Sequence, residues 1–150
     1  MTNFSLFRRA AFPALLSAFL CVTDAQAELG GTMSFTAAAP VSLLNGAARM
    51  RTSVDAGGTT IDEYASSTGR IFAYTWQGPT MPDLRALLGP YDASYRSGAT
   101  ANLAAGRELH AARVARPDVV VESGGQMRSY VGRAWLPDAL PAGVTPDDLH

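Results

Sequence analysis

The feature that most constrains the fold is a short segment, Arg70–Trp76, that would be apolar on both faces of a strand. Successive side chains of a strand point to opposite faces, so the three aromatic residues of this segment are expected to share one face. They are Phe72, Tyr74 and Trp76. Apolar mass on both faces is typical of the middle of a sheet, which predicts a central strand of an antiparallel meander.

Further strands are expected on both sides of this segment, from alternating patterns or from β-branched and aromatic residues. They are residues 49–54, Thr59–Tyr64, Val119–Val121 and Met127–Trp135, and Glu108–Val114 is a candidate for one more. The pair Gly124-Gly125 is typical of the turn of a hairpin between the last two. The sequence therefore predicts an α+β, mainly-β fold, built on an antiparallel meander of about five strands.

One short helix, around Pro82 to Leu88, is expected to pack on this sheet. Thr80 is placed to cap the free N–H groups at its start, and Asp83 is placed to reach back to them. Leucines form its buried stripe, and Gly89 is expected to end it. Residues 92–106 have weak periodicity and many small side chains, so a loop and a poorly formed helix fit equally well, and we assign them to a loop.

The first 27 residues have the order of a secretory signal peptide. Arg8 and Arg9 precede an apolar stretch from Ala10 to Val22, and Ala25 and Ala27 supply small residues at the two positions that determine cleavage. A membrane-spanning helix needs about 20 apolar residues, so this stretch is too short to be a retained anchor. We expect cleavage after Ala27 and a periplasmic or secreted mature chain, with no stable membrane anchor.

Behind the signal peptide, we expect an irregular N-terminal arm over residues 28–47 and one small globular domain over residues 48–150. A chain of 150 residues fits one core, and 47% hydrophobic against 17% charged residues is typical of chains that fold. The only cysteine, Cys21, lies in the expected signal peptide. The mature chain would therefore have no disulfide and no thiolate site.

Charge and histidine content argue against several classes of function. The formal net charge is -1, and the twelve basic residues are all arginines scattered along the chain, so a nucleic-acid partner is not expected. Only His110 and His150 follow the signal peptide, so we predict no metal site and no cofactor. His110 stands near Glu108, as a general base could, but a surface histidine on a strand is favoured. No catalytic residue is predicted.

Four segments of the chain resemble one protein family. They are ELGG at 28–31, GTTIDEYASSTGRIFAYTWQGPTMPDLRALLG at 58–89, VVVESGGQMRSYVGRAWLP at 119–137 and LPAGVTPDDL at 140–149. They resemble a family of small secreted proteobacterial proteins known as domain of unknown function 2844. The resemblance implies export and a single domain, and the family has no assigned activity to carry over. Its members often have histidine after the Gly-Gly pair, where this chain has Gln126.

Aromatic residues are numerous for so small a domain, and most are expected to fill the core. If one face of the sheet is left uncovered by the helix, the exposed members would form a surface that binds a peptide, a glycan or another envelope protein. The candidate binding residues are Tyr74, Trp76, Gln126, Tyr130 and Trp135.

We therefore expect a non-enzymatic binding or structural module of the cell envelope. The alternatives are an accessory protein to an envelope enzyme and a small hydrolase that uses carboxylates such as Asp62, Glu63 or Asp83. The hydrolase hypothesis predicts that two of these carboxylates face each other in a cleft.

Overall fold

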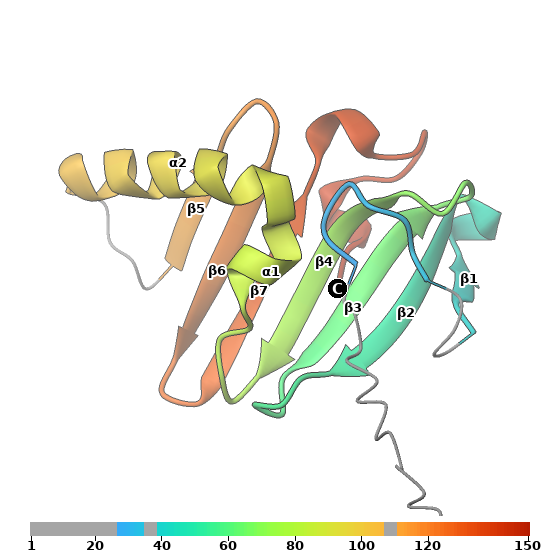
Figure 1. Cartoon of the computed structure of the whole chain (residues 1–150), viewed down its shortest axis with the longest axis horizontal. Coiled ribbons are helices and arrows are strands. Elements are labelled where there is room, and N and C mark those ends of the chain that lie inside the picture. The colour runs from blue at the N-terminus through green and yellow to red at the C-terminus, as the bar shows by residue number, and fades with distance from the viewer. Residues whose placement is uncertain (1–26, 35–38, 107–110) are drawn as a thin grey trace, which may run out of the picture.

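The protein is built on one antiparallel sheet with the strand order β1-β2-β3-β4-β7-β6-β5 (Figure 1). The structure is a computed structural model and describes residues 27–34, 39–106 and 111–150. The strands are β1 Val41–Leu43, β2 Ala48–Val54, β3 Thr60–Ser66, β4 Ile71–Gly78, β5 Ala111–Ala115, β6 Val120–Gln126 and β7 Ser129–Trp135. The predicted mainly-β, antiparallel fold is confirmed.

The sheet is larger than predicted, with seven strands in the described part of the chain instead of about five. Strand β1 comes from the segment expected to be an irregular arm, and its three residues are too few to show an alternating pattern. Strands β5, β6 and β7 form a second meander, and β7 pairs with β4. The strand with the most apolar sequence, β4, therefore lies in the middle of the sheet, as expected.

The helical part is also longer than predicted. Helix α1 (Leu84–Leu88) is followed by a 3-10 turn, η2 (Gly89–Tyr91), and by helix α2 (Asp92–Ala104), so the loop assigned to residues 92–106 is wrong. Gly89 ends α1 with a φ of 52°, but the chain enters α2 three residues later. Asp83, not Thr80, caps α1, because its side chain accepts a hydrogen bond from the Ala86 N–H at 3.1 Å.

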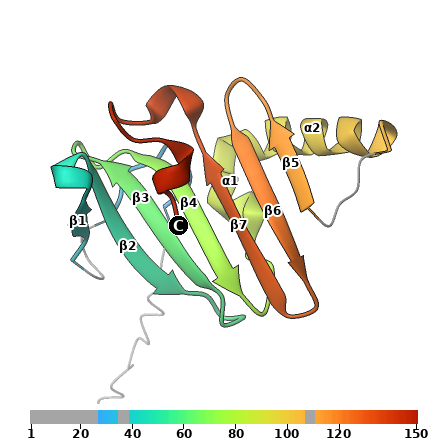
Figure 2. The same ribbon diagram turned by 180° about the vertical axis from the view of Figure 1, so that it is seen from behind.

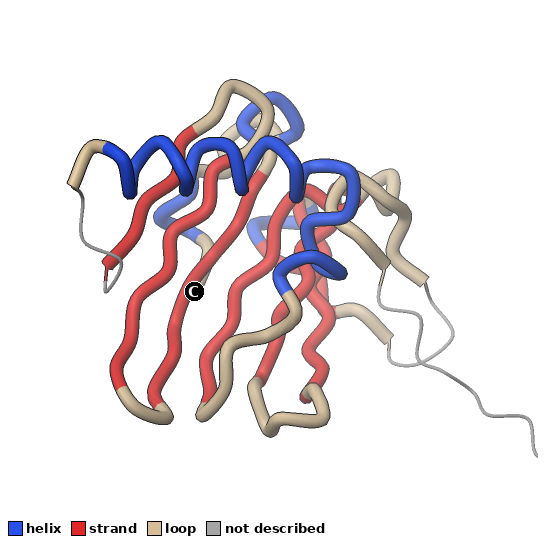
Figure 3. The backbone as a smooth tube through the Cα atoms, turned by 60° about the vertical axis from the view of Figure 1, so that its left-hand side comes forward, coloured by secondary structure: helices blue, strands red, loops and turns tan. Residues whose placement is uncertain are grey.

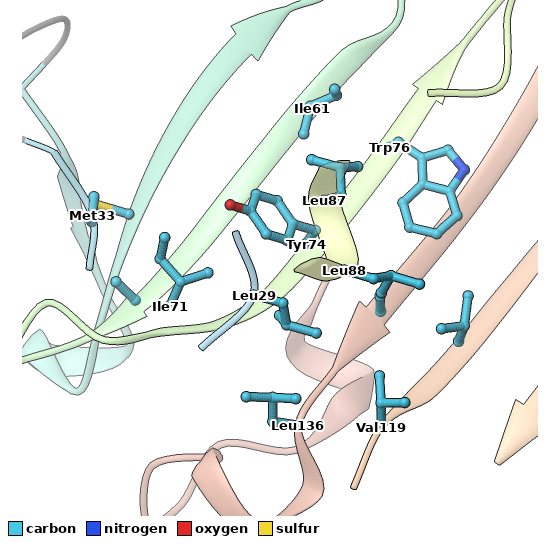
Figure 4. Close-up of a cluster of buried hydrophobic side chains, with 13 residues drawn as sticks. Leu29, Met33, Ile61, Ile71, Tyr74, Trp76, Leu87, Leu88, Val119 and Leu136 are labelled. Atoms are coloured by element: carbon cyan, nitrogen blue, oxygen red, sulfur yellow. The ribbon is translucent and has the colours of Figure 1, made fainter. Parts of the chain in front are cut away.

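The first face of the sheet, as we call it, is the one that the helices cover (Figures 1 and 3). It carries the larger core, in which residues of β3, β4, β6 and β7 pack against α1 and against the N-terminal segment. Figure 4 shows its labelled members: Leu29, Met33, Ile61, Ile71, Tyr74, Trp76, Leu87, Leu88, Val119 and Leu136.

A β-bulge in β4 changes which side chains share a face. The register of β3 with β4 shifts by one residue between Tyr64 and Ala65, which leaves Phe72 as an extra residue in β4. Ile71 therefore lies in the first-face core, whereas Phe72 joins the core of the opposite face. The expectation that the three aromatic residues of β4 share a face is wrong for Phe72, because the bulge interrupts the alternation.

The second face, opposite the helices, is covered at one end by the C-terminal segment 137–150 (Figure 2). Val144 and Leu149 from this segment are buried against Phe72 and Trp135 of the sheet. The segment contains two 3-10 turns, η3 (Pro137–Ala139) and η4 (Pro146–Asp148). Elsewhere on this face, the described residues place no helix.

The hairpin between β6 and β7 turns later than predicted. Gly124 and Gly125 lie within β6, and Met127 and Arg128 form the turn. A Cβ atom on Gly125 would lie 2.2 Å from the carbonyl oxygen of Ser129, so this position has no room for a side chain. The glycine pair is thus explained by close approach of the two strands and not by the turn.

Candidate functional site

A groove with a volume of about 830 Å³ lies on the second face of the sheet. Its floor is formed by β3, β4, β7, β6 and β5, and Leu149 and His150 at the end of the C-terminal segment also line it. Tyr64 holds this end against the sheet, because its hydroxyl donates a hydrogen bond to the main-chain oxygen of His150 at 2.9 Å. We call this cavity the groove.

Charged and polar side chains cross the groove in one row, which follows from the register of six strands. Cross-strand partners in an antiparallel sheet point to the same face, so one residue from each strand contributes. The row consists of Thr52, Asp62, Thr75, Arg133, Glu122 and Arg113. We call it the charged row; all but the first of its residues line the groove.

Glu122 is the centre of one half of the charged row. Its Oε1 lies 2.5 Å from Nη1 of Arg113, and its Oε2 accepts a hydrogen bond from Nε of Arg133 at 2.7 Å. Both guanidinium groups lie over the ring of Trp135, at 5.9 and 5.4 Å from its centroid. Each such contact contributes about 0.5–2 kcal/mol, so the buried indole fixes the two arginines in place.

Arg133 also joins the sheet to the C-terminal segment. Its Nη1 donates a hydrogen bond to the carbonyl oxygen of Pro146, and its Nη2 lies 3.6 Å from Asp147. At the other end of the charged row, Oγ1 of Thr52 donates a hydrogen bond to Oδ1 of Asp62 at 2.5 Å. The groove is thus a fixed arrangement of donors and acceptors that includes side chains with opposite charges.

A protein-family model described as "Protein of unknown function (DUF2844)" matches residues 25–149. The chain belongs to this family. Comparisons of this DUF2844 protein with curated proteins and with solved structures give no match. No helix in the described part of the chain is long and apolar enough to cross a membrane.

The candidate binding residues of this DUF2844 protein do not form one surface. Tyr74 and Trp76 are only 1% and 2% exposed and belong to the first-face core, and Trp135 lies beneath the two arginines of the groove. Gln126 is exposed at the end of β6, and Tyr130 is partly buried in β7. Of the five, Trp76 lines the groove in part, and Trp135 supports it from below.

Sequence reasoning missed Arg113, Arg133 and Glu122 of the DUF2844 groove. The available signal was the alternation of Val131, Arg133 and Trp135 along β7, which places an arginine between two apolar side chains on one face. The sequence alone does not predict that the cross-strand neighbours of Arg133 are Glu122 on β6 and Thr75 on β4.

The carboxylates of the hydrolase hypothesis lie apart. Asp62 and Glu63 are neighbours in β3, so Asp62 lines the groove, whereas Glu63 points to the first face, where it contacts Arg51 and Tyr74. Burial raises the pKa of Glu63, while the positive charge of Arg51 opposes this rise. Asp83 caps helix α1. His110 and Ala25 lie outside the described residues.

Proposed function

We propose that this DUF2844 protein is an exported, non-enzymatic binding module of the bacterial envelope, and that it holds a neutral, hydroxyl-rich glycan segment in its groove. The observation that carries the proposal is the charged row on the sheet face opposite helices α1 and α2, which the C-terminal segment covers only at one end. The groove volume, about 830 Å³, falls within the range of about 300–1,000 Å³ that is usual for ligand pockets.

The chemistry of the lining favours a neutral ligand. Two carboxylates, Asp62 and Glu122, stand beside two guanidinium groups, Arg113 and Arg133, so their formal charges cancel. A strongly charged ligand would gain little net Coulomb attraction here, whereas a ligand with many hydroxyl groups finds donors and acceptors together.

A glycan fits this groove better than an extended peptide does. A peptide bound along a sheet needs an unpaired strand edge and separate pockets for alternate side chains. The groove instead lies over paired strands, and its floor includes the flat backbone at Gly124 and Gly132. Hydroxyl and amide groups of Thr60, Thr75 and Gln77 extend the polar lining on the β4 side.

Binding without catalysis is supported by how the carboxylates are engaged. Hydrolysis of a glycosidic bond ordinarily needs one carboxylic acid and one carboxylate on opposite sides of the scissile bond. Both oxygens of Glu122 contact arginines, and the Oδ1 atom of Asp62 accepts a hydrogen bond from Thr52. Glu63 points to the other face, and Asp83 caps α1.

Titration of the folded chain with soluble envelope oligosaccharides, followed by amide chemical shifts, tests the binding proposal. We expect shifts at β4, β6 and β7, and we expect Arg113→Ala to weaken binding about tenfold, since a hydrogen bond to a charged group contributes about 1.5–3 kcal/mol. Arg113 is 62% exposed, so the variant should fold. Arg85→Ala, which removes another exposed arginine on α1, is the matched control.

Two results would contradict the proposed ligand. Equal affinity of the Arg113→Ala and Arg85→Ala variants would show that binding does not occur in the groove. Chemical-shift changes caused by peptides but not by oligosaccharides would show that the ligand is a peptide.

The export part of the proposal is tested separately, by the intact mass of the protein recovered from the periplasm or medium of its host. We expect the mass of a chain that begins at Glu28. An uncleaved, soluble cytoplasmic chain would contradict the export proposal.

A further inference from the structure

The segment directly after the expected cleavage site is built into the first-face core. Leu29 and Met33 are 0% and 1% exposed (Figure 4). Main-chain hydrogen bonds tie this segment to α1 and to the start of β4, from the Leu29 N–H to the Leu87 carbonyl at 2.8 Å and from the Gly30 N–H to the Ile71 carbonyl at 2.9 Å. The position at which the mature chain would begin is therefore fixed against the sheet.

A buried ion pair lies next to this segment. Nη2 of Arg51 is 3.0 Å from each carboxylate oxygen of Glu63, and Nη1 of Arg51 donates a hydrogen bond to the carbonyl oxygen of Ser34 at 2.7 Å. Glu63 is only 4% exposed. Its Oε1 atom accepts no hydrogen bond of good geometry from the described residues, so the carboxylate retains capacity for another donor nearby.

The hydroxyl of Tyr74 faces two acceptors at once. It lies 3.0 Å from Oε2 of Glu63, and it also contacts the main-chain carbonyl oxygen of Ala27. A phenol carries one proton, so it can donate a full hydrogen bond to only one of the two oxygens. While the chain continues through Ala27, the second oxygen is left facing the hydroxyl without a proton between them, which costs free energy at a buried site.

Cleavage after Ala27 would replace the surplus acceptor by a donor. The nitrogen of Glu28 is bonded to the carbon that carries the Ala27 oxygen, so it lies about 2.3 Å from the oxygen that contacts Tyr74. We propose that the α-ammonium group of Glu28, once released, donates to the Tyr74 hydroxyl, and that this hydroxyl then donates to Glu63. The proposal rests on the export and cleavage proposed above, and it makes signal removal a step that stabilises the fold.

The charges around Tyr74 also favour an ammonium group at this position. The charged groups around Tyr74 are the guanidinium of Arg51 and the carboxylates of Glu63 and Glu28. In the uncleaved chain the negative charges are in excess, and the ammonium group of the cleaved chain balances them. Both burial and the charge of Glu63 raise the pKa of Tyr74, which keeps its hydroxyl protonated as the proposed relay requires.

The pH dependence of this stabilisation follows from the groups involved. An α-amino group has an ordinary pKa of about 8, and on this proposal the neighbouring carboxylates favour its charged form in the folded chain. The expected contribution to stability is complete below about pH 8 and is lost at higher pH. The stabilisation by the ammonium group also weakens in acid, because a protonated Glu63 can itself donate a hydrogen bond to the hydroxyl oxygen of Tyr74 or to the carbonyl oxygen of Ala27.

Two chains that differ by one residue test the proposal. Residues 28–150 and 27–150 are released from a fusion by a protease that leaves no added residue, so only the second has the Ala27 carbonyl. At pH 7 we expect the 28–150 chain to melt about 4 °C higher, and we expect this gap to close above about pH 10. In the Tyr74→Phe background, which removes the relay hydroxyl, the gap should fall to about 1 °C.

Equal melting temperatures of the two chains at pH 7, or a gap that is the same at pH 7 and pH 10, would overturn the proposal. This comparison of the unsubstituted chains stands even if the Tyr74→Phe variant does not fold. The export proposal is tested by a different measurement, the mass of the protein recovered from its host. The two proposals can therefore fail independently of each other.

Discussion

At the scale of single residues, Gly132 explains how a tryptophan fits into the middle of the sheet. A Cβ atom at this position would lie 2.3 Å from Cζ2 of Trp76 and 2.6 Å from the main-chain oxygen of Glu122. The indole of Trp76 therefore packs directly on the backbone of β7. This contact is the reason why Trp76 belongs to the core, although its position on an aromatic strand suggested a binding residue.

Gly132→Ala is expected to lower the free energy of unfolding by about 2 kcal/mol, because neither the indole nor the strand backbone can move away cheaply. Urea denaturation measures the change. The matched background is Trp76→Phe, in which the smaller ring leaves room and most of the loss should be recovered. Trp76→Phe itself also removes an Nε1–H that has no partner among the described residues. A Gly132→Ala variant as stable as the parent would contradict this packing.

At the scale of elements, helix α2 is positioned by a close contact with the edge strand β5. Gly98 is the buried residue of this helix, and a Cβ atom there would lie 2.5 Å from Cγ1 of Val114. The amide of Asn102 on α2 donates a hydrogen bond to the carbonyl oxygen of Arg113, at 2.9 Å. The helix thus covers part of an edge that could otherwise pair with another chain.

Gly98→Leu is expected to separate α2 from β5 and to lower the free energy of unfolding by about 2 kcal/mol, because a large side chain cannot enter the contact. Hydrogen exchange of the α2 amides should become faster, while exchange in β4 should change much less. Ser97→Leu, at the neighbouring exposed position, introduces the same side chain away from the contact and is the control. Similar exchange in both variants would argue against a docking role for Gly98.

The same elements show what the sequence could and could not predict. Strands β2 and β3, and β4 beyond its bulge, follow their alternating or β-branched patterns, because each has at least one partly buried face. Helix α2 escaped prediction because its buried residue is a glycine, which produces no apolar stripe. The bulge at Phe72 and the partners of Arg133 depend on pairing between distant strands, so they become visible only in the folded chain.

At the scale of the whole molecule, the two faces of the sheet are closed in different ways. Helices and the N-terminal segment bury the first face, whereas the C-terminal segment covers only one end of the second face and lines the groove (Figures 1 and 2). Within this segment, the main-chain N–H and the hydroxyl of Thr145 both donate to Oδ2 of Asp148, at 2.7 and 2.8 Å. The shape of the groove therefore depends on a cap held by one carboxylate.

Asp148→Asn should loosen this cap at neutral pH and weaken the proposed binding of a glycan, because the charged acceptor of Thr145 is lost. In the parent chain, hydrogen bonds from Thr145 lower the pKa of Asp148 below its ordinary value of 3.8. The cap is therefore fully formed above about pH 3.8 and is lost as the pH falls below that value.

Hydrogen exchange of the Leu149 N–H, which donates to the carbonyl oxygen of Pro146, measures the opening of the cap. Asp138→Asn, outside the cap, should change neither exchange nor affinity, and if both variants behaved alike, the groove would not depend on this segment.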